Sequence, residues 1–155
     1  MYSATERERR VAGVVAEVLE KQTFMFAEPC ESGDLESESG RFLRAQMGFS
    51  GPVVGDLEVV APFEMCAALA ANALGVEPED ESAGQYAADT FMEFLNVACG
   101  QLLTTIYGTG EVFWLSPPRV EVLNPAGWMR MCERPAGVGM RVEEWPVLVF
   151  LEVER

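Results

Sequence analysis

The sequence of 155 residues contains no histidine. This absence excludes the Ser-His-Asp and Cys-His nucleophile systems and every metal site that uses an imidazole ligand. Basic residues are also scarce, because 11 Lys and Arg stand against 25 Asp and Glu, and the formal net charge is −14. Nucleic acids and anionic membrane surfaces are bound through positive charge, so we expect neither as a partner. Any chemistry must use carboxylates, amides, hydroxyls or thiols.

Paired cysteines and long apolar runs are missing as well. The four cysteines lie more than thirty residues apart, at Cys30, Cys66, Cys99 and Cys132. Without close pairs, a structural zinc site is not expected, and the scatter favours a reducing cytoplasm over a disulfide framework. Cys66 and Cys99 fall inside apolar helical patterns and are expected in the core. The longest apolar run, residues 65–76, is too short to span a bilayer, and the N-terminal residues lack the apolar segment of a signal peptide.

Hydrophobic periodicity predicts one α+β domain over residues 1–155. The length supports a real core, and 49% of the residues are apolar. Helical spacing predicts three helices. The first begins at a cap formed by Ser3 or Thr5 and ends at about residue 21, and the others span residues 62–75 and 82–107. Period-two alternation predicts strands at 43–49, 53–60, 112–115, 138–142 and 147–153. Because the strands come as hairpins, we expect an antiparallel sheet.

Turn and capping residues set the boundaries of these elements. Pro62 is expected in the first turn of the second helix and Gly75 at its end. Ser82 is expected to cap the third helix, together with Gln85 as a capping box. Residues 27–40 are acidic without a basic residue and are interpreted as a mobile acidic loop, with a binding role as the alternative. We assign no role to residues 124–139.

The third predicted helix carries two stripes of different character. An apolar stripe, expected to face the sheet, consists of Phe91, Leu95, Ala98, Leu102 and Ile106. A second stripe, of Asp89, Glu93, Asn96 and Gly100, is offset from it by two residues, or about 200°. Glu93 and Asn96 should therefore lie side by side on an exposed face. Such residues are ordinary on a solvated helix, and Gly100 has two explanations: close approach of a partner, or tight packing of the preceding helix.

The second stripe resembles a known signature. Asp89-x-x-x-Glu93-x-x-Asn96, then Gly100 and a proline, Pro118, placed 22 positions after Asn96, resembles the motif of the CheC/CheX/FliY chemotaxis phosphatases. The resemblance covers roughly residues 40–155. A single motif in a short chain is more similar to CheX than to CheC or FliY. It implies a CheC-like fold, in which long helices pack on one face of an antiparallel sheet.

The resemblance also implies a function in chemotaxis or two-component signalling. That function is hydrolysis of the aspartyl phosphate on a CheY-like response-regulator receiver domain. An acyl phosphate is already activated, so such catalysis is mainly positioning and charge stabilisation. The family assigns Asn96 to orient the attacking water and Glu93 to pair with the receiver's lysine. Asp89, Gly100 and Pro118 are expected to support them, and Mg²⁺ is expected on the receiver, with no metal or cofactor on this chain.

Other interpretations remain open at this point. The same fold could bind a receiver without catalysis, and 25 acidic residues leave room for an unrelated carboxylate enzyme. The resemblance implies a homodimer through sheet edges, which the apolar C-terminal strand could form, unless that strand is central in a monomer. No Lys or Arg occurs between Arg44 and Arg119, a span with ten acidic residues and the whole motif. Such a surface could meet phosphate only inside a partner that supplies positive charge.

Overall fold

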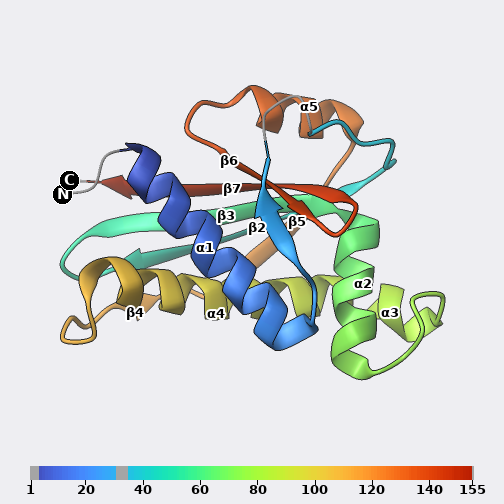
Figure 1. Cartoon of the computed structure of the whole chain (residues 1–155), viewed down its shortest axis with the longest axis horizontal. Coiled ribbons are helices and arrows are strands. Elements are labelled where there is room, and N and C mark those ends of the chain that lie inside the picture. Colours follow the sequence, from blue (N-terminus) through green and yellow to red (C-terminus); the bar gives the residue numbers. More distant parts are fainter. Residues whose placement is uncertain (1–3, 31–34, 155) are drawn as a thin grey trace.

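A computed structural model describes residues 4–30 and 35–154, which form one antiparallel sheet with helices on both faces (Figure 1). The sheet has seven strands in the order β1-β6-β7-β3-β2-β4, and β5 also pairs with β2. The strands are β1 (Ala27–Pro29), β2 (Phe42–Ser50), β3 (Val54–Pro62), β4 (Trp114–Leu115), β5 (Arg119–Leu123), β6 (Val138–Val142) and β7 (Trp145–Glu154). The predicted α+β class with an antiparallel sheet is confirmed.

Three helices of twelve residues or more cover one face of the sheet. They are α1 (Ala4–Thr23), α2 (Phe63–Leu74) and α4 (Ala87–Tyr107). Their buried side chains share one core with alternate residues of the strands, such as Leu43, Ala45 and Met47 of β2. This arrangement confirms the expectation that the long helices pack on one face. Of the two N-terminal caps considered, Ser3 lies outside the described residues and Thr5 lies within α1.

The opposite face carries a short helix that the sequence did not reveal, α5 (Pro125–Glu133) (Figure 1). The side chain of Asn124 caps it by accepting a hydrogen bond from the Gly127 amide at 2.8 Å. Trp128 stacks on Phe42 of β2, with ring centroids 4.7 Å apart. Together with Met131, Trp128 and Phe42 belong to a second core on this face. A helix of nine residues with so few buried anchors gives too weak a periodic signal to be predicted.

The acidic segment 27–40 is not a loop throughout, so this prediction is wrong in part. Ala27–Pro29 form β1, which pairs with β6, and Ala27 lies opposite Val142. Leu35 is buried, and its carbonyl oxygen accepts a hydrogen bond of 3.0 Å from the Trp128 indole. A three-residue strand is too short to show alternation, and its partner lies more than one hundred residues further along the chain. Residues 31–34 lie outside the described residues.

Several predicted boundaries need correction. Pro62 is the N-cap of α2 and not part of its first turn, whereas Gly75 ends α2 in the left-handed conformation as predicted. The third predicted helix is interrupted at Tyr86 and consists of α3 (Glu81–Gln85) followed by α4. Asp80, and not Ser82, caps α3, because its carboxylate accepts a hydrogen bond of 2.9 Å from the Ser82 amide. The strand expected at 112–115 is reduced to β4.

The position of β7 decides one of the open alternatives. The sheet order places β7 between β6 and β3, so both of its edges are already paired. It is a central strand, and the idea that the C-terminal strand forms a dimer edge is wrong. Among the described residues, no helix is long and apolar enough to cross a membrane.

Candidate functional site

The two stripes of α4 lie on opposite sides of the helix, as the spacing predicts. Phe91, Leu95, Ala98 and Leu102 are buried in the main core, and Ile106 is half-buried against it. Asp89, Glu93 and Asn96 are exposed, and Gly100 is intermediate. The buried stripe fixes the rotation of α4 on the sheet, so the polar stripe is held outward on a rigid element.

Glu93 and Asn96 are neighbours on this outward side. Residues three apart on a helix have Cβ atoms about 5–6 Å from each other. A single partner group can therefore meet the carboxylate and the carboxamide together. Asp89 lies in the first turn of α4, where the helix dipole stabilises a negative charge. The helix α4 alone thus carries four of the five predicted site residues, because Gly100 follows on the same helix.

Gly100 lies one turn beyond Asn96 on a surface with free space. A Cβ atom added at Gly100 would meet no atom within 4 Å outside its own helical turns. The preceding helix therefore does not require a glycine here, and the interpretation that Gly100 serves internal packing is wrong. A mid-helix glycine is less stable than alanine by about 0.5–1 kcal/mol, and no described residue packs closely enough against Gly100 to offset this cost.

Pro118 lies at a β-bulge on the edge strand beside α4. Both β4 and β5 pair with β2, but their registers differ by one residue, so residues 116–118 oppose only residues 47–48. The Gly48 amide donates to Ser116 Oγ at 2.7 Å, and the Ser116 amide donates to the Gly48 carbonyl at 2.9 Å. Proline has no amide hydrogen and suits a bulge, where the ladder is interrupted.

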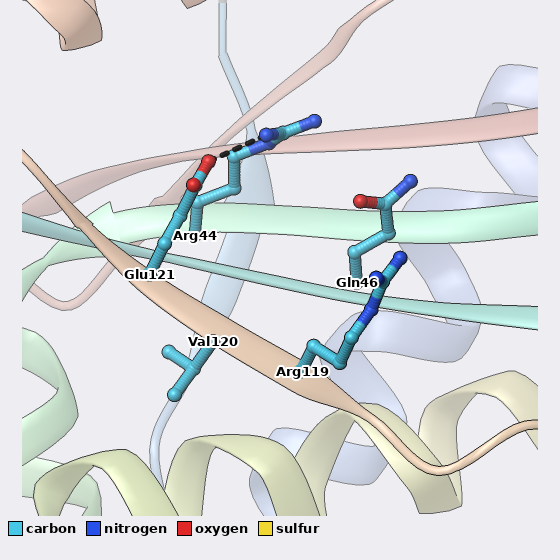
Figure 2. Close-up of a pocket in the computed structure, with 5 residues that line it drawn as sticks. All are labelled: Arg44, Gln46, Arg119, Val120 and Glu121. Atoms are coloured by element: carbon cyan, nitrogen blue, oxygen red, sulfur yellow. Dashed lines mark hydrogen bonds and ion pairs between the residues drawn. The ribbon is translucent and has the colours of Figure 1, made fainter.

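The chain reverses after α4, so the bulge returns along the helix. The strand β5, which begins directly after Pro118, is in contact with α4, the helix that carries Asn96. Figure 2 shows β5 crossing over α4, with Val120 on the helix side of the strand.

The other side of β5 and its neighbours carries a network of charges that the sequence did not indicate. Glu58 of β3 is 2% exposed and forms ion pairs with Arg44 and with Arg134, the latter at 2.9 Å. Arg44 also reaches Glu121 at 2.5 Å, and these two residues help to line a shallow pocket with Gln46 and Arg119 (Figure 2). The hydrogen bond that Arg44 donates to the Glu58 carboxylate raises the pKa of Arg44.

Part of this network connects α5 to the sheet. Arg134 follows α5 directly, so its ion pair with Glu58 ties α5 to the sheet. Its guanidinium also stacks on the Phe150 ring at 4.0 Å. The pairing of β2 with β3 could have revealed the ion pair between Arg44 and Glu58. Gln46 lies opposite Glu58 in this pairing, so Arg44 is the diagonal neighbour of Glu58. Arg134 could not have been found, since it lies 76 residues from Glu58.

The buried cysteines do not offer a nucleophile. Burial raises the pKa of Cys99, on the inner side of α4, to about 12. Burial also raises the pKa of Cys66 well above its usual value. Both positions confirm the prediction of core residues, and both thiols stay protonated near neutral pH. Within residues 4–30 and 35–154, no group of three or more acidic or cysteine side chains could hold a metal ion.

Sequence comparison identifies one family for this region. The family model described as "Chemotaxis phosphatase CheX" matches residues 43–122, which include the stripe from Asp89 to Gly100 and also Pro118. No curated protein matches the chain.

Solved structures share the fold over nearly the whole chain. Chemotaxis protein CheX from Vibrio vulnificus superposes with a TM-score of 0.71 at 13% identity, covering 99% of this chain and 100% of that one. A chemotaxis protein from Desulfovibrio vulgaris Hildenborough gives 0.69 at 17% identity, covering 96% and 97%. The CheX of a CheX-CheY-BeF3-Mg complex from Borrelia burgdorferi gives 0.64 at 18% identity, covering 95% and 97%. At these identities the likeness concerns the fold.

Proposed function

The chain belongs to the CheX family of chemotaxis phosphatases, and from that premise we propose that it hydrolyses the aspartyl phosphate of a CheY-like receiver domain. The observation that carries the proposal is the pair Glu93 and Asn96, exposed side by side on the face of α4 that points away from the core. A rigid helix that projects two polar groups suits insertion into the active site of another protein.

Asn96 is the residue proposed to act on the reacting atoms. A carboxamide oxygen accepts a hydrogen bond from water, and its NH2 group donates to a phosphoryl oxygen. Asn96 can therefore align a water for in-line attack on the phosphorus without changing its own protonation state. Water adds to phosphorus, the bond to the receiver's carboxylate oxygen breaks, and inorganic phosphate leaves. No histidine is needed for this step.

Glu93 is proposed to bind the receiver and not the phosphate. Two negative groups repel each other, so the Glu93 carboxylate suits the lysine of a receiver active site. Residues 45–118 contain no Lys or Arg, so positive charge and Mg²⁺ would come from the receiver. The Borrelia burgdorferi relative, solved with CheY, BeF3 and Mg, supports this division of roles.

The test follows loss of phosphate from phosphorylated receivers of the host. Wild-type protein should accelerate the loss for at least one receiver, and N96A should remove the acceleration while the fold is retained. Q101A is the matched control, because it removes an exposed carboxamide from another side of α4. Wild-type protein that binds a receiver without changing its decay would instead make the chain a receiver-binding module. Light scattering would separately test the homodimer; among the described strands, the outer edges of the sheet are formed by β1 and by β4 with β5.

A further inference from the structure

Tyr86 occupies a position that its local structure does not explain. It ends α3 and begins α4, with backbone angles φ −101° and ψ 8° and no hydrogen bond from its side chain to cap α4. Ser, Thr, Asp and Asn are the residues that normally stabilise this position. The tyrosine is 43% exposed and belongs to neither of the two buried cores. A large aromatic side chain therefore remains partly at the surface and does not cap α4.

The position of Tyr86 continues the polar stripe of α4. It precedes Asp89 by three residues, and the stripe then proceeds in steps of four, three and four to Gly100. Tyr86 lies ten residues before Asn96, or about 15 Å along the helix. An interface of standard size buries about 800 Å² per partner, which corresponds to a disc about 16 Å in radius. A receiver centred on Asn96 therefore covers Tyr86.

We propose that Tyr86 is a binding contact for the receiver, and this inference rests on the proposed function. Charge indicates which partner binds the outward face of α4. Asp89 and Glu93 make this face acidic, and no basic residue occurs within residues 45–118. A receiver with a lysine beside its phosphorylated aspartate complements that charge. The Tyr86 ring then lies against the receiver surface next to the active site, and tyrosine is among the residues that most often dominate binding energy.

The distance separates the role of Tyr86 from that of Asn96. At about 15 Å from Asn96, the phenol cannot touch the phosphoryl group or the attacking water. Its loss should therefore weaken receiver binding without slowing the chemical step. We expect Y86A to raise KM about tenfold and to leave kcat unchanged. Y86F should stay close to wild type, because the ring supplies the contact.

The experiment measures kcat and KM for the same phosphorylated receiver with each variant, together with thermal unfolding. M129A is the control, because Met129 is 59% exposed on α5, at the opposite face of the sheet. It should leave both constants unchanged. Y86S is a second truncation, and its hydroxyl can cap the helix N-terminus. If Y86A alone failed to fold, Y86S would still measure the effect of removing the ring.

The outcomes distinguish this inference from the proposed function. An N96A variant as active as the wild type would overturn the proposed function. An inactive N96A combined with unchanged KM in Y86A and Y86S would overturn only the role of Tyr86. A lower kcat at unchanged KM in the folded Tyr86 variants would also contradict it, whereas a raised KM in both, with Y86F near wild type, supports it.

Discussion

Replacement of Gly100 by alanine separates the requirements of the fold from those of the partner. The added Cβ would meet nothing within 4 Å outside its own helical turns, so it introduces no clash within the chain. Alanine in mid-helix is more stable than glycine by about 1 kcal/mol. For a domain of this size, such a gain raises the unfolding midpoint by about 2–4 °C. G100A should therefore be more stable than the wild type.

The same methyl group should weaken phosphatase activity. It projects from the stripe one turn beyond Asn96, where the receiver is proposed to approach the helix backbone. Overpacking of a close contact typically costs about 1–3 kcal/mol, so kcat/KM should fall by at least about fivefold. The assays are urea unfolding followed by circular dichroism, and phosphate release from a phosphorylated receiver.

Gly13 supplies the matched control for this experiment. It is an exposed glycine inside α1, and a Cβ there also meets nothing within 4 Å. G13A should gain similar stability and keep full activity. Full activity in G100A would refute the close approach at Gly100, and a loss of stability in G100A would refute the open surface described for it.

Four further substitutions test the fold around the site. G55A should lower the free energy of unfolding by at least about 2 kcal/mol in urea denaturation, because its Cβ would clash with the Glu152 carbonyl oxygen. A near-neutral effect would contradict this packing. E58Q should lower the free energy of unfolding by about 3 kcal/mol in the same assay, since it leaves two partly buried arginines without their shared carboxylate. E121Q removes a more exposed partner of Arg44 and should lower it by less than about 1 kcal/mol. Equal losses in the two variants would contradict this difference. Burial, followed by nearby negative charges, raises the pKa of Asp56 above its ordinary value of 3.8, so ionisation of Asp56 weakens the folded state as pH rises. D56N should therefore raise the thermal midpoint at pH 7 but not below about pH 3.8, where Asp56 is already neutral. If the midpoints of D56N and wild type differed by the same amount at both pH values, ionisation of Asp56 would not be the cause.

The elements that could be predicted are those with a long periodic pattern. Alternation along β2 and β3 revealed both strands, because one side of each lies in the main core. The period of 3.6 residues separated the two sides of α4 and placed Glu93 beside Asn96 without knowledge of any other element. This part of the site was accessible because its geometry belongs to a single helix.

The remaining features depend on contacts between distant segments. The helix α5 forms because Trp128 stacks on Phe42, which lies 86 residues earlier in the chain. The strand β1 exists only by pairing with β6. The break at Tyr86 has no proline or adjacent glycine run to announce it, and the place of Pro118 follows from the registers of β4 and β5 on β2. Local propensity does not contain such information.

The central claim is that Asn96 supplies chemistry and not affinity. Its most direct test is the first-order decay of a phosphorylated receiver that is saturated with N96A, with saturation checked by binding of the BeF3⁻-loaded receiver. The account predicts binding close to that of the wild type and a decay no faster than that of the receiver alone. Decay of the bound receiver at the wild-type rate would contradict the account.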